Sequence, residues 1–266
     1  MNLHGITHIF NEALLLPWWV LHHRGVFDSM LVINYGSTDN SMEIVREMAP
    51  GWTIVDSELL EFDASKLDAQ VMAVERTLPT GPDEFKLVLN TTEFMWDSNF
   101  RKNLELDHYC YPETQAFGLK SFCLVDGENE LDFPVYYEEP LWLNHTHGKL
   151  DSAFPGAVPR HSRFVHNGND GRYGLGRHHT ELPHRDMEGS YLLHATFAPW
   201  PQAVERKLQI QTKMSQHDKT NGFGIQHQQT PESLDVTYRN WLDHSYSLFE
   251  NEDYRRIYDE YCAQHV

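Results

Sequence analysis

Residues 30–48 read MLVINYGSTDNSMEIVREM. The apolar run at the start is typical of a buried strand, and the second half has the spacing of an amphipathic helix. Between them, Ser37, Thr38 and Asp39 place two hydroxyls and a carboxylate where the strand would meet the helix. Such side chains cap free backbone N–H groups, or they bind a polar ligand at the end of a strand. The stretch therefore predicts a strand, a tight turn and a helix, and leaves open whether the turn is a cap or a binding site.

The same order of elements repeats along the first third of the chain. Apolar runs predict strands over residues 6–10, 31–33, 53–55 and 85–89, and intervening segments predict helices over residues 11–23, 42–48 and 69–78. Strands that alternate with helices form parallel sheets with right-handed crossovers. We therefore expect an α/β fold with a mostly parallel sheet flanked by helices.

The pattern changes after residue 100. Residues 114–124 predict one more strand, whereas residues 126–190 are rich in Gly, Pro, His and Asp and predict a loop-rich region with short strands over the sheet edge. Residues 211–232 are polar, and the spacing of Tyr254, Ile257, Tyr258 and Tyr261 predicts a final helix. The expected division is a domain over residues 1–210, followed by a polar linker and C-terminal helical extension over residues 211–266.

Composition excludes several classes of protein. The 266 residues carry a formal net charge of −18, which disfavours nonspecific binding to nucleic acid or to anionic membranes. Cys110, Cys123 and Cys262 form no spaced motif and predict a reducing compartment. No apolar run approaches the roughly 18 residues of a membrane span, and the first residues lack the pattern of a signal peptide. These features predict a cytoplasmic protein; they do not predict its oligomeric state.

Polar residues follow three of the expected strands. Asn11 and Glu12 follow the first, residues 34–39 follow the second, and residues 90–93 follow the fourth. In an open α/β sheet, ligands bind in the crevice outside the carboxyl ends of the strands. The three segments therefore predict a nucleotide site at that edge of the sheet.

Several of these segments resemble the family 2-like glycosyltransferases with a GT-A fold. Phe10-Asn11-Glu12, the residues LPWWVLHH at 16–23 and NYGSTD at 34–39 are similar to the opening of that family. LNTTEF at 89–94 stands where the family has Asp-x-Asp-Glu-Phe, and GRHH at 176–179 is similar to its Gly-x-His segment. Leu192-Leu193-His194, with Gln202 and Lys207 downstream, resembles its late Leu-His-Phe segment.

The resemblance implies transfer of a sugar from a nucleotide-sugar donor to a glycan or glycolipid acceptor. It implies Glu93 as the catalytic base, and a divalent cation, Mn²⁺ or Mg²⁺, that neutralises the leaving diphosphate. The donor-binding residues that it implies are Asn11, Glu12, Asn34, Gly36, Ser37, Asp39, Asn90, Thr92, Arg177 and His179.

The sequence departs from the family at its acidic motif. Asn90 and Thr92 replace both carboxylates of Asp-x-Asp, and Asn34 replaces the acid at the second strand end. Neutral oxygens bind Mg²⁺ and Mn²⁺ far less well than carboxylates. Three alternatives follow: a metal-independent enzyme, a metal ion bound by Glu93 and His194, or a degenerate protein that binds a nucleotide or glycan without catalysis. The first alternative needs cations to offset the diphosphate charge, and the candidates are Arg160, Arg163, Arg172 and Arg177.

Histidines suggest a third class of function. The chain has 17 of them, and many fall between residues 145 and 194. None forms a His-Glu-x-x-His or a cysteine-containing zinc motif. Because of the number of histidines, a histidine-rich metal hydrolase is a third hypothesis beside a glycosyltransferase and a binding protein.

Overall fold

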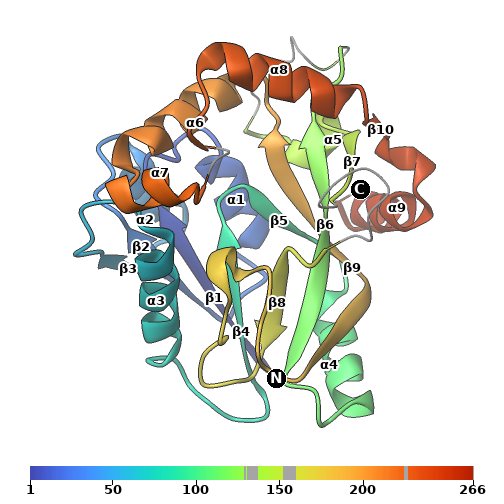
Figure 1. Cartoon of the computed structure of the whole chain (residues 1–266). Helices are drawn as coiled ribbons and strands as arrows, with labels where there is room; N and C mark the ends of the chain where they lie inside the picture. Colours follow the sequence, from blue (N-terminus) through green and yellow to red (C-terminus); the bar gives the residue numbers. More distant parts are fainter. Residues whose placement is uncertain (129, 131–136, 152–159, 225–226, 266) are drawn as a thin grey trace.

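The chain is built around one mixed β-sheet, seen here in a computed structural model that describes residues 1–128, 130, 137–151, 160–224 and 227–265 (Figure 1). Ten strands of the described residues belong to this sheet. Eight of them follow the order β10-β7-β6-β8-β4-β1-β2-β3, while β9 pairs with β6 and β5 pairs with β9. Helices cover the sheet on both faces, so the predicted α/β class is confirmed.

The N-terminal half supplies the parallel part of the sheet. Its strands β4, β1, β2 and β3 are neighbours in that order, and every pair among them is parallel. The crossovers contain the three predicted helices, with boundaries that differ by a few residues. The elements are β1 (Asn2–Ile9), α1 (Leu16–His23), β2 (Ser29–Asn34), α2 (Ser41–Met48), β3 (Thr53–Asp56), α3 (Ala64–Glu75) and β4 (Glu84–Asn90).

The C-terminal half adds strands of mixed direction. They are β5 (Glu93–Trp96), β6 (Ala116–Val125), β7 (His147–Leu150), β8 (Arg163–His166), β9 (His184–Phe197) and β10 (Tyr246–Ser247). The expectation that residues 126–190 lie over the sheet edge is wrong for β8, which lies between β4 and β6 and is antiparallel to both. With only four residues, β8 is too short for a periodic pattern to be recognised in the sequence.

Side-chain alternation along the parallel strands separates two packed faces. On β4, Phe85, Leu87 and Leu89 join the larger hydrophobic cluster, together with residues of α1, α2 and the C-terminal α9 (Glu252–His265). Val88, from the alternate positions, packs with Val71 of α3 in a second cluster. This period of two is that of a pleated strand buried on both sides. Successive residues of β4 therefore face the α1–α2 side and the α3 side in turn.

The remaining helices close the molecule around the sheet. They are α4 (Phe100–Cys110), α5 (Leu141–Asn144), α6 (Gln202–Lys213), α7 (Gln216–Asn221), α8 (Pro231–Leu242) and α9, with short 3₁₀ turns η1 (Leu175–Arg177) and η3 (Leu248–Glu250). The predicted final helix is confirmed in α9. Residues 211–232 are not a plain linker, because they contain the end of α6 and all of α7. The division at residue 210 stays a prediction.

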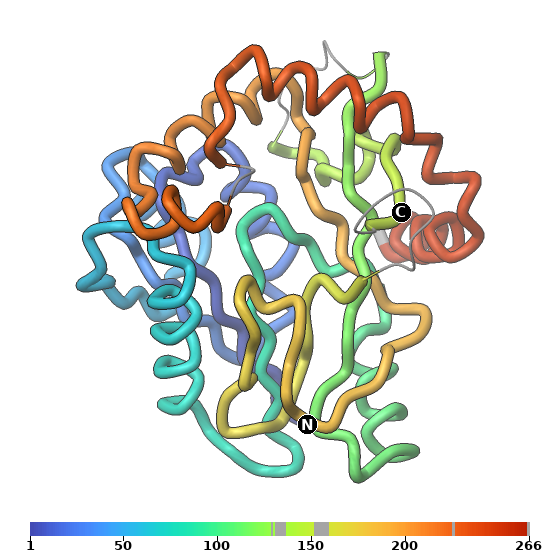
Figure 2. Tube along the Cα trace, viewed as in Figure 1, coloured from blue at the N-terminus to red at the C-terminus, as the bar shows by residue number. Residues whose placement is uncertain are grey.

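Segments far apart in sequence meet where α6 and α7 approach the start of α3 (Figure 2). Phe62 exchanges two backbone hydrogen bonds of 2.7 Å with this region, one to the Lys213 carbonyl and one from the Ser215 N–H. The junction fixes α6 and α7 beside the carboxyl ends of the parallel strands. No helix in the described part of the chain is both long enough and apolar enough to cross a membrane.

Candidate functional site

The Gly36–Asp39 turn is held against the end of β1 by Asn11. The Asn11 Oδ1 accepts hydrogen bonds from the backbone N–H groups of Thr38 at 2.8 Å and Asp39 at 3.3 Å. In return, the Asn11 N–H donates to Ser37 Oγ at 3.2 Å. Gly36 and Asn11 adopt φ values of 71° and 52°, which glycine and asparagine tolerate best. The two loops therefore form one hydrogen-bonded unit.

Asp39 and Asn34 complete this unit. The Asp39 carboxylate accepts from the N–H groups of Ala13 at 3.2 Å and Ser41 at 3.0 Å, so it links the loop before α1 to the first residue of α2. The Asn34 Oδ1 accepts from the Ser37 N–H at 2.9 Å, and its Nδ2 donates to Asp56 at 2.8 Å. Neither N-cap residue, Leu15 of α1 or Asn40 of α2, makes a side-chain capping hydrogen bond, so the assignment of the turn as a cap or a binding site stays a prediction.

A cavity of about 780 Å³ lies at the carboxyl ends of β1, β2 and β4, on the face covered by α3. The predicted convergence of the three strand ends is confirmed, because Phe10, Tyr35 and Asn90 all line this space. Of the residues predicted as a site, six line the cavity: Glu12, Asn90, Thr92, Glu93, Arg177 and His194. Six others are not among its lining residues: Asn11, Asn34, Gly36, Ser37, Asp39 and His179. Their assignment to donor binding stays a prediction.

Charged side chains are paired around the cavity. Among the described lining residues, each of four arginines contacts one acid at 2.6–2.9 Å. The pairs are Arg160–Asp151, Arg163–Glu93, Arg177–Asp68 and Arg206–Glu12. Arg172, the fourth arginine suggested by the sequence, does not line the cavity. Sequence reasoning missed Asp68 and Arg206, because both pairs join segments far apart in the chain.

Glu93 is buried at 1% exposure, and both of its oxygens are engaged. Arg163 contacts Oε1 through Nη2 at 2.7 Å and donates from Nε to Oε2 at 2.9 Å. The Asn90 N–H also donates to Oε2 at 2.8 Å, which closes the turn between β4 and β5. A general base must have a free oxygen for a substrate proton. In this geometry, Glu93 holds Arg163 and the turn, and its role as a base stays a prediction.

The second predicted metal ligand, His194, lies directly opposite Glu93 in the β5–β9 pairing. Burial, together with the positive charge of Arg163, holds the pKa of His194 well below its usual range, so the ring is neutral. A neutral imidazole can bind a metal ion, but the Glu93 carboxylate beside it is already neutralised by Arg163. Glu93 and His194 belong to no group of three potential metal ligands among the described residues.

Asn90 belongs to a network centred on Arg177. Arg177 Nη1 donates to Asp68 at 2.6 Å, and Nη2 donates to Asn90 Oδ1 at 2.9 Å. His8 Nε2 lies 2.7 Å from the same Asn90 oxygen, and burial together with Arg177 lowers the pKa of His8 to about 3. The Oδ1 atom of Asn90, which stands where the family has a carboxylate, is therefore engaged by side chains of the protein itself.

Lys207 differs from the four arginines because it has no acidic partner among the described residues. Its side chain projects from α6 into the cavity, with its residue only 8% exposed, and its ammonium lies 4.8 Å from the centre of the Phe197 ring. Burial, with repulsion from Arg206, lowers the pKa of Lys207 to about 8. The structure thus presents a buried cation to an open cavity.

Further polar atoms of the lining residues lack a hydrogen-bond partner within the described parts of the chain. They are Tyr35 Oη, Arg177 Nε, Asp218 Oδ1 and His227 Nδ1. Buried polar atoms are rarely left unsatisfied in folded proteins, and those that are call for an explanation such as a ligand. Tyr35 stands within the segment singled out by the sequence, whereas no sequence signal marked Asp218 or His227.

The chain is similar to solved structures at low sequence identity. No family model matches the chain, and no curated protein matches it. Among solved structures, TarS (residues 1–349) from S. aureus is similar at 14% identity and a TM-score of 0.32, over 51% of this chain and 39% of that one.

A second similar structure is glucosyl-3-phosphoglycerate synthase from Mycobacterium tuberculosis, in complex with Mn²⁺, UDP and glucosyl-3-phosphoglycerate. It is 14% identical with a TM-score of 0.33, over 50% of this chain and 47% of that one. The chain thus spans less than half the length of either structure.

Proposed function

We propose that this chain is a glycosyltransferase that binds a nucleotide-sugar in the cavity and holds its diphosphate through Lys207, without a metal ion between them. The observation that carries the proposal is the ammonium of Lys207, which is buried, lines the cavity and has no acidic partner among the described residues. The resemblance of the sequence segments to GT-A glycosyltransferases supplies the class of reaction. The proposed acceptor is a glycan or glycolipid, and the proposed compartment is the cytoplasm.

The described part of the lining carries equal numbers of positive and negative side chains, and the support for an anionic ligand is local to Lys207. Four arginine–carboxylate pairs cancel in charge, which leaves Lys207 as the positive group and Asp218 as the negative group among the described lining residues. Two opposite unit charges about 4 Å apart attract by about 4 kcal/mol at an effective dielectric constant of about 20. A phosphate beside Lys207 would therefore recover part of the cost of burying the ammonium.

Neighbouring arginines can add donors. Arg160 uses Nε to reach Asp151, and Arg206 uses Nε and Nη2 to reach Glu12. Each guanidinium has five N–H groups, so both keep donors for a phosphate oxygen. A lysine flanked by arginine donors is a common arrangement for a diphosphate.

Apolar residues of the cavity lining suit the nucleoside. Phe10, Tyr35, Phe62, Ile210 and Met214 are among them. Tyr35 Oη and Arg177 Nε belong to lining residues and lack partners among the described residues, and a base or ribose offers an acceptor to each of them. Glu12 and Asn90 are hydrogen-bonded to Arg206 and Arg177. We therefore propose that Glu12, Asn90 and Thr92 contribute to donor binding by positioning neighbouring side chains.

In the proposed reaction, the bond between the anomeric carbon and the diphosphate oxygen breaks, and a bond to the acceptor oxygen forms. The diphosphate leaves with the electron pair, and Lys207 stabilises the charge that develops there. The acceptor proton passes to a base. Glu93 remains the candidate for that base only if substrate binding releases one of its contacts with Arg163.

A second candidate function is binding without catalysis. The engagement of both Glu93 oxygens favours it, because no described carboxylate of the β4–β5 turn is then free to act. A protein of this kind would recognise the nucleotide part and leave the sugar intact.

The test begins with thermal shifts of the purified chain in UDP-, GDP- and dTDP-sugars, each with and without Mn²⁺. Stabilisation by one nucleotide-sugar without Mn²⁺, followed by slow release of free sugar, is the expected result. Stabilisation without any turnover supports the binding protein. No stabilisation by any nucleotide contradicts both functions.

A further inference from the structure

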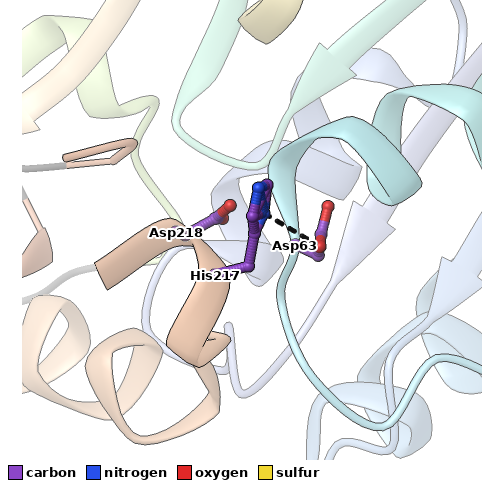
Figure 3. A group of neighbouring side chains, drawn as sticks. All are labelled: Asp63, His217 and Asp218. Carbon is purple, nitrogen blue, oxygen red and sulfur yellow. Dashed lines mark ion pairs between the residues drawn. The ribbon is translucent and has the colours of Figure 1, made fainter. Parts of the chain in front are cut away.

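A cluster of potential metal ligands lies beside the cavity, where α7 meets the start of α3. It consists of Asp63, His217 and Asp218, and Figure 3 shows the His217 ring between the two carboxylates. One potential ligand atom from each residue lies within 4.8 Å of the other two. Within the described ranges, no other three residues of these types come so close. None of the three was marked by the sequence patterns.

One oxygen of this cluster has no hydrogen-bond partner among the described residues. Asp218 is only 3% exposed, and its Oδ2 accepts a hydrogen bond of 2.8 Å from the Ala64 N–H. Its Oδ1 is buried and makes no hydrogen bond with the described residues. An unsatisfied carboxylate oxygen inside a protein is costly unless a cation or donor meets it. This oxygen is an observation separate from the grouping of the three residues.

We propose that Asp63, His217 and Asp218 bind a divalent transition-metal ion. Two ligands that are each about 2.1 Å from one ion lie at most about 4.2 Å apart. Asp63 Oδ2 and His217 Nδ1 are 3.8 Å apart, which fits this limit. An imidazole with two carboxylates suits Zn²⁺, Mn²⁺ or Co²⁺ better than Mg²⁺ or Ca²⁺, which prefer oxygen ligands alone.

The backbone around the ligands is already fixed. Asp63 caps α3 by accepting from the Lys66 N–H at 3.2 Å, and Ser215 caps α7 by accepting from the Asp218 N–H at 3.1 Å. The backbone bonds between Phe62 and residues 213–215 hold the two segments together. Ser65 Oγ donates a hydrogen bond of 2.7 Å to Asp63 Oδ1, and the other oxygen, Oδ2, faces His217. Metal binding would therefore need movement of side chains only.

Lys66 is the competitor for the site. Its ammonium lies 3.6 Å from Asp63 Oδ2, the oxygen that also faces His217. The Lys66 side chain is 66% exposed, so it can swing into solvent when a metal ion enters. The proposal thus predicts that removing the Lys66 charge strengthens metal binding. If the three residues bind no metal ion, the same substitution leaves the metal affinity of the chain unchanged.

The ion would connect two walls of the cavity. Asp218 lines the cavity itself, as do Phe62 and Ala64 on either side of Asp63. Metal binding should therefore stiffen the junction of α3 and α7 and stabilise the fold even when no nucleotide is present. This consequence is separate from the proposed sugar transfer.

The experiment is calorimetric titration of the chelator-treated full chain with Zn²⁺, Mn²⁺ and Mg²⁺, alongside the visible spectrum of the Co²⁺ form, all without nucleotide. We expect one Zn²⁺ per chain, a higher melting temperature and weak or absent Mg²⁺ binding. His217→Ala and Asp218→Asn should each weaken Zn²⁺ binding by about tenfold or more, and Lys66→Met should strengthen it.

Two features keep the test decisive. Asn at position 218 can still accept from the Ala64 N–H, so the metal-free variant should melt as the wild type does. His244→Ala removes an exposed histidine outside the cluster and is the matched control. Equal Zn²⁺ affinity in the wild type, His217→Ala and His244→Ala overturns the proposal, as does the absence of stoichiometric binding. Nucleotide affinity measured after chelation tests the proposed function independently.

Discussion

Arg206 and Glu12 are joined by two hydrogen bonds of 2.6 Å across 194 residues of sequence. The pair connects α6 to the loop after β1, and Arg206 neutralises the negative charge of Glu12. Lys207, the next residue on α6, is left facing the cavity without such a partner. Arg206 therefore has a structural role, whereas Lys207 is available to a ligand.

Removing the charge of Glu12 should therefore change stability and binding in opposite directions. In Glu12→Gln, Arg206, whose side chain is only 12% exposed, loses its counter-charge, and breaking such a pair costs about 3 kcal/mol of folding free energy. The second positive group then strengthens binding of a nucleoside diphosphate by several-fold. Denaturant unfolding and calorimetry measure the two effects. Weaker binding at unchanged stability would contradict this role of Glu12.

The affinity for an anionic ligand should depend on pH through Lys207. Its pKa is about 8 in the free protein, because burial and Arg206 disfavour the charged form. Lysine is positive below its pKa, so affinity should be steady below about pH 8 and fall above it, by up to about tenfold per pH unit. Titrations of UDP from about pH 6.5 to 9.5 check this. An affinity that rises with pH would contradict the prediction.

The Glu93–Arg163 pair should dominate local stability. In Glu93→Gln, Arg163 stays buried without a counter-charge, which costs about 3–5 kcal/mol. The expected result is a lower melting temperature with a matching loss of the β4–β5 turn. Unchanged stability, retained donor binding and complete loss of transfer would instead identify Glu93 as a catalytic base.

Asn11 should be essential to the turn that marks the fold. Asn11→Ala removes the two hydrogen bonds that the side chain accepts from the backbone of the turn, and alanine tolerates the positive φ of this position less well than asparagine does. We expect a loss of about 1–3 kcal/mol of folding free energy. Asn11→Asp keeps the accepting oxygen and the tolerance of positive φ, and should lose less. Equal losses in the two variants would show that the bonds to Thr38 and Asp39 are unimportant.

Local patterns in the sequence accounted for much of the fold. The strand–turn–helix around Gly36 depends on residues close in the chain, and so do the three other strands and two helices of the parallel half. The insertion of β8 between β4 and β6 was not predictable in this way. It depends on pairing across most of the chain, while its own four residues carry little pattern.

The candidate site was predicted only in part. The strand ends identified the position of the cavity, and the resemblance drew attention to Arg177, His194 and Lys207. The charge state of the site depends on contacts such as Arg163–Glu93, separated by 70 residues, and Arg206–Glu12. Spacing along the sequence cannot show which basic side chain forms an ion pair with an acid far away in the chain. For the same reason, Asp63, His217 and Asp218 did not stand out as a group.

The central claim is that Lys207 binds the anionic part of a nucleotide ligand. It is tested most directly by calorimetric UDP binding, without metal, to the wild type, Lys207→Met and the control Lys102→Met, which removes an exposed lysine outside the cavity. We predict that Lys207→Met binds UDP at least about tenfold more weakly and melts at an equal or higher temperature, because a buried charge costs stability. Lys102→Met should bind as the wild type does. Equal UDP affinity in all three proteins would contradict the claim.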